Sequence, residues 1–196
     1  MHAGPSTGSG VTYTRWGKSS CPSTDGTQLV YAGRAAGSAY NSPGGGGGEI
    51  LCLPLNPDYI NNSRASGAYY YSILHGGEYD TWGGPLDNLG NHNVACAVCL
   101  ASTRAAMTMV PAKTQCPTSW TREYYGYLMS ERENGAQFTQ SSYSVTCVDV
   151  TPDTVLGKAR NTGGTHFTYV VASCADGILC PQYVADRVLS CAVCTK

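Results

Sequence analysis

The chain has 196 residues, of which 13% are charged, and its formal net charge is −1. A nucleic-acid binder normally carries a basic face, and a membrane span needs about 20 consecutive apolar residues, so the sequence indicates neither class. The length fits one large domain or two small ones. Glycine and tyrosine are abundant, which is typical of strands separated by turns.

The first ten residues, MHAGPSTGSG, predict a flexible Gly/Ser tail or linker over 1–10. They hold no apolar stretch, so we expect a secreted, extracellular chain whose targeting segment has been removed. The triplet Asn61-Asn62-Ser63 is a glycosylation sequon with Asn61 as the acceptor, which agrees with that expectation.

Strand-like pieces follow one another along the chain, and no run of apolar residues has helical spacing. The pieces read TQLVYAG (27–33), EYYGYLM (123–129), YSVTCVDV (143–150) and HFTYVVAS (166–173), with Gly-rich breaks elsewhere. This alternation predicts an all-β protein.

The cysteines indicate an internal duplication. The chain has ten of them: Cys21, Cys52, Cys96, Cys99, Cys116, Cys147, Cys174, Cys180, Cys191 and Cys194. The first four recur 95 positions later, as 116, 147, 191 and 194. We therefore expect two homologous β repeats, over residues 11–105 and 106–196.

Residues near the cysteines repeat as well, some of them with the same offset. Lys18 recurs as Lys113, and the dipeptide Pro57-Asp58 recurs as 152–153. A tyrosine and a glycine with one residue between them follow each Cys-Pro, at Tyr31 and at Tyr124. These matches strengthen the prediction of a duplicated unit.

The tetrapeptide Cys-Ala-Val-Cys occurs at 96–99 and again at 191–194. A redox motif of this type sits between a strand and a helix, and zinc ribbons place two such pairs about 15–20 residues apart. Neither context is present, and the even number of cysteines favours disulfides. The residues alone leave the pairing open, because even four cysteines allow three connectivities.

Four stretches together resemble the C-terminal non-collagenous domain of type IV collagen, and more closely that of the short-chain, spongin-type collagens of invertebrates. They are VTYTRWGKSSCPS (11–23), EILCLPLNPDY (49–59), VACAVCLASTRAAMTMVPAKTQCPTSWTREYYGYLMSE (94–131) and LSCAVCTK (189–196). The resemblance covers nearly the whole chain from residue 11 and implies two tandem, homologous, disulfide-stapled β subdomains.

The resemblance also implies a disulfide pairing and a function. The implied pairs are Cys21–Cys99, Cys52–Cys96, Cys116–Cys194, Cys147–Cys191 and Cys174–Cys180. The related domain has no catalytic role and is a β-rich trimerisation module. We therefore expect a secreted structural or assembly module of the extracellular matrix. Its expected partners are further copies of itself, with a trimer as the implied oligomer, and matrix proteins or glycans.

Sequence motifs for catalysis or metal binding are lacking. GxSxG and HExxH do not occur, and the aspartates follow no calcium-loop pattern. We interpret Glu131 and Glu133 as parts of a solvated loop rather than as a pair of catalytic carboxylates. The expectation is a protein that is not an enzyme and holds no cofactor and no metal.

A secreted lectin on the same scaffold is the alternative function. Lectins stack an aromatic ring on the apolar face of a sugar, while Asp, Asn and His bind its hydroxyls. The segment HGGEYDTWGGPLDNLGNH (75–92) concentrates such residues: Tyr79, Asp80, Trp82, Asp87, Asn91 and His92. The corresponding region of the second repeat offers Asn161, His166 and Tyr169. In the competing interpretation, Tyr79 and Trp82 pack between strands and the polar residues lie in turns.

Overall fold

The computed structural model describes residues 10–40, 47–59, 72–131, 144–155, 161–174 and 180–196. Within these residues the chain is all-β, as the sequence predicts. The elements in chain order are β1 (Val11–Trp16), β2 (Thr27–Gly37), β3 (Leu51–Pro54), β4 (His75–Tyr79), the 3-10 helix η1 (Asp87–Leu89), β5 (Ala95–Ala101), β6 (Met107–Pro111), β7 (Thr121–Ser130), β8 (Thr146–Asp149), β9 (Thr165–Tyr169) and β10 (Ser190–Thr195). No helix among the described residues is long and apolar enough to cross a membrane. The predicted acceptor Asn61 lies outside the described residues.

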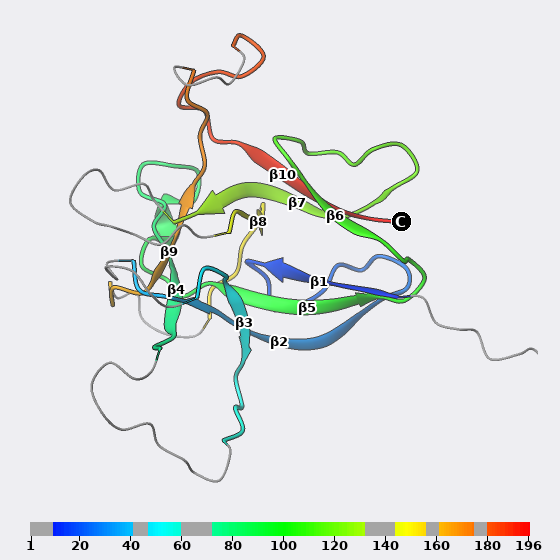
Figure 1. Ribbon diagram of the computed structural model, residues 1–196, viewed down its shortest axis with the longest axis horizontal. Coiled ribbons are helices and arrows are strands. Elements are labelled where there is room, and N and C mark those ends of the chain that lie inside the picture. Colours follow the sequence, from blue (N-terminus) through cyan, green and yellow to red (C-terminus); the bar gives the residue numbers. More distant parts are fainter. Residues whose placement is uncertain (1–9, 41–46, 60–71, 132–143, 156–160, 175–179) are drawn as a thin grey trace, which may run out of the picture.

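The strands form one hydrogen-bonded path in the order β6-β10-β7-β8-β1-β5-β2-β4-β9, with β3 beside β2 and β9 also beside β7. Most pairs are antiparallel, but β1–β8 and β4–β9 are parallel. Both parallel contacts join a strand of β1–β5, called the first half below, to a strand of β6–β10, called the second half. Figure 1 shows β1, β2 and β5 below β6, β7 and β10.

The strand pairing of the first half recurs in the second. β5 lies between β1 and β2, and β10 lies between β6 and β7. The registers correspond as well, because Trp16 pairs with Cys96 and Pro111 pairs with Cys191. Each long strand also has a register shift at the same place, which leaves one extra residue there. That residue is Val30 in β2 and Glu123 in β7, a difference that matters below.

Five disulfides join all ten cysteines. They are Cys21–Cys99, Cys52–Cys96, Cys116–Cys194, Cys147–Cys191 and Cys174–Cys180, the same five pairs that the resemblance to the collagen domain implies. So many disulfides indicate an oxidising compartment, such as the extracellular space.

The two cysteines of Cys-Ala-Val-Cys cannot pair with each other, because they lie three positions apart on one strand. Successive strand residues point to opposite faces, and three steps span about 10 Å, beyond the reach of a direct bridge. Cys96 packs in the core cluster around Trp16, and Cys99 packs in the cluster around Tyr13. The two cysteines of each tetrapeptide therefore form two separate disulfides, one on each face of the strand.

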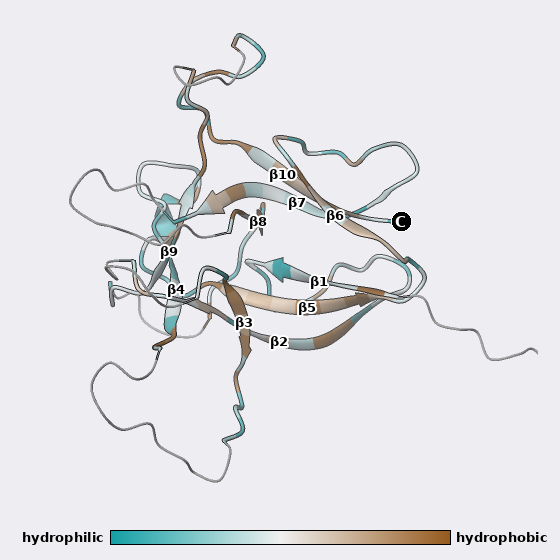
Figure 2. Cartoon of the chain, in the orientation of Figure 1, coloured by the Kyte–Doolittle hydropathy of each residue, from teal (hydrophilic) through white to brown (hydrophobic). Residues whose placement is uncertain are grey.

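These two clusters form the core, and β5 contributes to both. Figure 2 shows β5 as one of the hydrophobic strands. Neighbouring strands approach closely at two equivalent glycines. A Cβ added to Gly33 would overlap the carbonyl oxygen of Leu53, and one added to Gly126 would overlap that of Val148. Glycine is therefore required in both halves where the long strand crosses the short one.

Buried tyrosines should make the fold unstable at alkaline pH. Burial raises the pKa of Tyr13, Tyr79 and Tyr124, and the Glu123 carboxylate raises that of Tyr13 further. In the unfolded chain these hydroxyls ionise near pH 10. The unfolded state then releases protons that the folded state keeps, so the full stability is present below about pH 10 and is lost above it. Each tyrosine contributes a loss of about 1.4 kcal/mol per pH unit.

Denaturant unfolding at a series of pH values measures this effect. We expect the free energy of unfolding to fall steeply above about pH 10 and tyrosinate absorbance of these residues to appear only on unfolding. A free energy of unfolding that stays flat through this range would contradict the burial of the three hydroxyls.

Candidate functional site

The loop between β4 and β5, residues 80–92, is called the Trp82 loop and contains η1. Short hydrogen bonds fix its path. The Thr81 hydroxyl donates to the carbonyl of Leu86 at 2.7 Å, and the Gly83 N–H donates to Oδ1 of Asp87 at 2.8 Å. The Leu86 N–H donates to the hydroxyl oxygen of Tyr169 at 2.8 Å, which ties the loop to β9. The loop is thus an ordered part of the fold.

Trp82 lies on the surface of this loop, with 60% of the residue exposed. The competing interpretation, in which Tyr79 and Trp82 both pack between strands, is wrong for Trp82 and right for Tyr79. The indole rests against Gly90, where an added Cβ would come within 2.6 Å of the ring. One side of the ring is therefore supported by backbone, and the residue remains accessible to solvent.

Tyr79 does not join Trp82 at the surface, which corrects its prediction as a sugar-binding residue. It ends β4, which lies between β2 and β9, and none of its surface is exposed. Its hydroxyl donates to the carbonyl of Asp153 at 3.0 Å. Since none of the Tyr79 surface is exposed, a sugar cannot reach this ring.

Asp80 also turns inward, toward a buried polar cluster. Its Oδ2 lies 3.6 Å from Nδ1 of His166, and Oε1 of Glu131 lies 3.5 Å from the same nitrogen. Oε2 of Glu131 accepts the backbone N–H of His166 at 2.9 Å, and the ring of Tyr40 stacks on the imidazole of His166. Glu131 is thus buried, contrary to the solvated loop expected from the sequence, while Glu133 lies outside the described residues. No group of three metal-ligating side chains is found in the described part of the chain.

Three other predicted residues do share the surface of the Trp82 loop. Asp87 begins η1, and Asn91 holds a left-handed backbone with φ 63° while its N–H donates to the carbonyl of Tyr79. Nδ1 of His92 lies 3.1 Å and 3.2 Å from the carbonyl oxygens of Leu89 and Gly90. The structure therefore brings Trp82, Asp87, Asn91 and His92 to one loop surface.

The corresponding residues of the second half do not form a second loop of this kind. Tyr169 lies beneath the Trp82 loop, against Gly84, and its hydroxyl accepts the Leu86 N–H. Asn161 accepts the N–H of Gly163 through its own side chain. The second half thus supports the Trp82 loop of the first.

A second region of interest is the junction at which the second half covers the free edge of β1. The Tyr124 hydroxyl lies 3.0 Å from the carbonyl oxygen of Thr14 and 2.9 Å from that of Cys147, so it bridges the two halves. The Tyr13 hydroxyl donates to Glu123 at 2.9 Å. The Tyr13 and Tyr124 rings stack on each other.

Charged contacts extend the same junction. Arg15 forms an ion pair with Asp149 at 2.6 Å, and Lys18 forms one with Asp153 at 2.8 Å. The Asp153 N–H also donates to the carbonyl of Gly17. We call residues 13–18 the edge face of the first half, and residues 123–124 with 148–153 the cover face of the second half.

The duplication creates a second edge face and a second cover face. At the offset of 95, the edge face of the second half comprises residues 108–113, and residues 148–153 of the cover face correspond to 53–58. The matching register shifts make residues 30–31 equivalent to 123–124, so the cover face of the first half comprises residues 30–31 with 53–58. The Tyr31 hydroxyl donates to the carbonyl of Cys52 at 3.0 Å, which matches the contact between Tyr124 and Cys147.

Within the described part of the chain, neither of these second faces pairs with a strand of the other half. There, β6 pairs with β10 alone and β3 with β2 alone. The cover face of the first half exposes apolar surface, since Val30 and Leu55 are 54% and 63% exposed. In contrast, Glu123, the equivalent of Val30, is buried in the junction. One edge face and one cover face therefore contact each other within the chain. The second edge face and the second cover face remain available for a contact between copies, and we call them the open faces.

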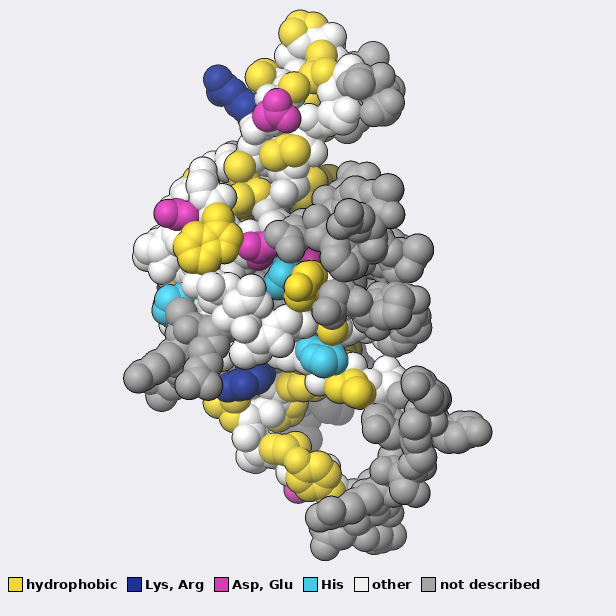
Figure 3. Space-filling view, turned by 90° about the vertical axis from the view of Figure 1, so that its left-hand side faces the viewer, with side chains coloured by type: hydrophobic (Ala, Val, Ile, Leu, Met, Phe, Trp, Pro, Cys, Tyr) yellow, Lys and Arg dark blue, Asp and Glu magenta, His cyan; other side chains and the backbone are white. Residues whose placement is uncertain are grey.

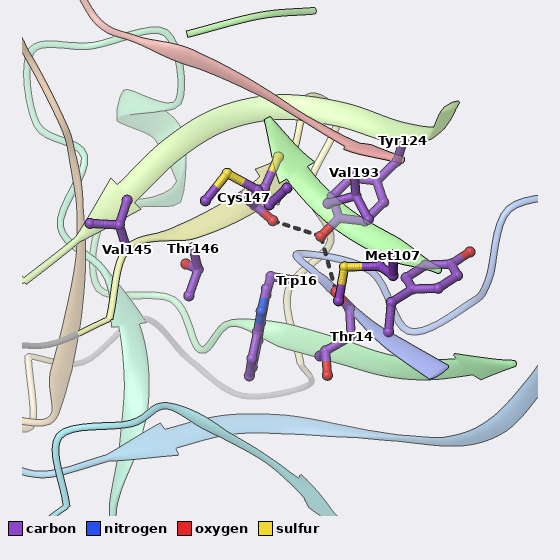
Figure 4. Close-up of a pocket in the computed structure, with 10 residues that line it drawn as sticks. Thr14, Trp16, Met107, Tyr124, Val145, Thr146, Cys147 and Val193 are labelled. Carbon is purple, nitrogen blue, oxygen red and sulfur yellow. Dashed lines mark hydrogen bonds between the residues drawn. The ribbon is translucent and has the colours of Figure 1, made fainter. Parts of the chain in front are cut away.

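A pocket of 210 Å³ lies beside the junction. Figure 4 shows Thr14 and Trp16 on one side of it and Met107 and Val193 on the other, with the hydrogen bonds of Tyr124 drawn as dashed lines. The lining is mostly apolar, and the Tyr124 hydroxyl is already engaged. Pockets for small organic ligands usually measure about 300–1,000 Å³ and offer several free polar groups. The geometry therefore does not favour a small-molecule site here.

No protein-family model matches this chain, and a search of curated proteins finds no similar sequence.

Proposed function

We propose that this protein is a self-assembling structural module of the extracellular matrix, in which the contact between its two halves is repeated between copies. The cover face of one copy, with Tyr31 and Val30, would lie on the edge face of the next, with Met109 and Lys113. The supporting observation is the mismatch described above: one edge face is covered by the partner half and the equivalent one is not.

The charges and apolar groups of the two open faces are complementary. Lys18 pairs with Asp153 within the chain, and the repeat supplies Lys113 on the open edge face and Asp58 on the open cover face. Both residues are exposed. The carbonyl oxygen of Met109 stands where that of Thr14 stands in the covered edge. The Tyr31 hydroxyl can therefore bridge to it as Tyr124 bridges to Thr14.

Such a contact is heterologous, because each copy contributes two different surfaces. Heterologous contacts close into rings when the rotation per copy allows it. The resemblance to the type IV collagen domain implies a ring of three copies, which would contain six halves related by similar contacts. On this proposal the fold is that of the collagen domain, with subdomains over 11–105 and 106–196.

Replacing Val30 with aspartate tests the proposal. The wild-type protein is expected to sediment as an oligomer at micromolar concentration. Val30→Asp should remain folded, because residue 30 is exposed in the single chain. In the proposed contact it would bury an unpaired carboxylate and weaken association by at least about tenfold.

Trp82→Ala is the matched control, since it also removes an exposed apolar side chain but lies outside the edge and cover faces. It should assemble like the wild-type protein in sedimentation velocity. A wild-type protein that is monomeric at micromolar concentration would refute the proposal, and so would a Val30→Asp variant that assembles normally.

A further inference from the structure

We propose that the Trp82 loop binds a neutral hexopyranose, with the apolar face of the sugar stacked on the Trp82 indole. The loop lies outside the edge and cover faces, so this site is independent of the proposed assembly. The proposal depends on the rigid presentation of Trp82 and on the polar groups and the charge of its loop.

The indole is held in a defined orientation before any ligand arrives. The backbone at Gly90 supports the ring, and the residue is 60% exposed. The hydrogen bond from Gly83 to Asp87 fixes the chain directly after Trp82, and the one from Leu86 to Tyr169 anchors the loop to β9. A ligand that stacks on this ring therefore incurs little cost for ordering the protein.

The loop that presents the ring also carries polar groups with unused hydrogen-bonding capacity. Oδ1 of Asp87 accepts the Gly83 N–H, which leaves Oδ2 to accept a hydrogen bond from a ligand hydroxyl. Nδ1 of His92 faces the two carbonyl oxygens of Leu89 and Gly90, so in the neutral ring it carries the proton. Nε2 of His92 is then an acceptor. The loop thus combines one aromatic surface with hydrogen-bond acceptors.

The apolar surface is the size of a sugar rather than that of a protein interface. Within residues 80–92, all of which the structure describes, Trp82 is the only exposed large hydrophobic side chain. A stable protein–protein contact buries about 800 Å² on each partner, far more than one indole. A pyranose matches the site, because it has one apolar C–H face and a rim of hydroxyl groups.

The charge of the loop selects among sugars. Residues 80–92 contain Asp80 and Asp87 but no lysine or arginine. Figure 3 shows the face of the molecule seen from the left-hand side of Figure 1, on which η1 lies, and Lys and Arg side chains are sparse among its described residues. The exposed Asp87 carboxylate repels sulfated and uronic glycans, so the expected ligand is neutral.

Nuclear magnetic resonance titration with neutral methyl hexopyranosides (glucoside, galactoside and mannoside) tests the site. The chain has three tryptophans, so Trp16 and Trp120 provide internal controls. We expect at least one neutral glycoside to shift the indole N–H resonance of Trp82 and the amide of Asn91, while the other two indoles stay unchanged. Glucuronate should bind more weakly.

Two variants and a control complete the experiment. Trp82→Ala should raise the Kd, read from the Asn91 amide, by at least about tenfold. Gly90→Ala keeps the indole but displaces it, and should weaken binding without loss of fold. Tyr183→Ala, which removes another exposed aromatic ring, should bind normally. The proposal would be overturned if no neutral glycoside shifted these resonances, or if the shifts persisted in Trp82→Ala. Tighter binding of glucuronate than of the neutral glycosides would also overturn it.

Discussion

Replacing Cys147 and Cys191 together by alanine is expected to lower the free energy of unfolding by about 4 kcal/mol. Their disulfide ties β8 to β10 across 44 positions of the chain, and both residues are buried in the core. In the chain-entropy model, a bridge that closes a loop of this length restricts the unfolded chain strongly. Denaturant unfolding of the purified variant measures the loss.

The short disulfide between Cys174 and Cys180 provides the matched control. It spans 6 positions, so its removal by the same pair of alanine substitutions should cost about 2 kcal/mol. The ranking of the two variants is the critical result. Equal losses, or a larger loss for the short bridge, would contradict the account in which the long bridges stabilise each half by closing large loops of the chain.

Replacing Glu123 with leucine is the second change with a large expected effect. The buried carboxylate accepts hydroxyl hydrogen bonds from Tyr13 at 2.9 Å and Thr195 at 2.6 Å. It also forms an ion pair with Arg104 at 2.9 Å. Removing it leaves these donors and a largely buried guanidinium without their acceptor. We expect a loss of about 3–5 kcal/mol in the free energy of unfolding.

A double-mutant cycle with Arg104→Leu separates this cause from simple loss of packing. If most of the loss in Glu123→Leu comes from the unpaired guanidinium, the double variant should lose less free energy of unfolding than the two single variants lose together. Denaturant unfolding measures these losses. Strict additivity would show that Glu123 and Arg104 do not depend on each other.

The all-β class and the strand pairing that recurs in the two halves could be predicted from the sequence because they depend on local patterns. The cysteine offset identifies the repeat, and the pieces around 27–33 and 123–129 lie in β2 and β7. The piece at 166–173 is only partly a strand, since β9 ends at Tyr169. Strand ends depend on where a neighbouring strand stops, which the sequence of one piece does not contain.

The candidate sites were predicted less well, because burial depends on tertiary contacts. Tyr79 and Trp82 lie three residues apart in a similar Gly-rich setting, yet one is fully buried and the other is on the surface. The difference comes from β9, which pairs with β4 at Tyr79, whereas Trp82 lies in the unpaired loop that follows. Glu131 is buried through His166, 35 positions away, and no local pattern marks such a pair.

One signal in the sequence did point toward the junction between the halves. The repeated Lys18 and Lys113, and the repeated Pro-Asp dipeptides, lie at the edge and cover faces. Only the structure shows that Lys18 forms an ion pair with Asp153. This contact explains the repeated lysine and the repeated Pro-Asp dipeptide as the two sides of the junction. The equivalent pair, Lys113 with Asp58, lies on the two open faces.

A charge-swap experiment on this pair tests the central claim most directly. Sedimentation velocity would compare Lys113→Glu, Asp58→Lys and the chain that carries both changes. Both residues are exposed, so all three chains should fold. Each single change places like charges opposite each other between copies and should weaken association several-fold. The double variant restores an opposite-charge pair and should assemble nearly as well as the wild-type protein. Single variants that assemble like the wild-type protein, or a double variant no better than the single ones, would contradict an assembly that repeats the internal junction.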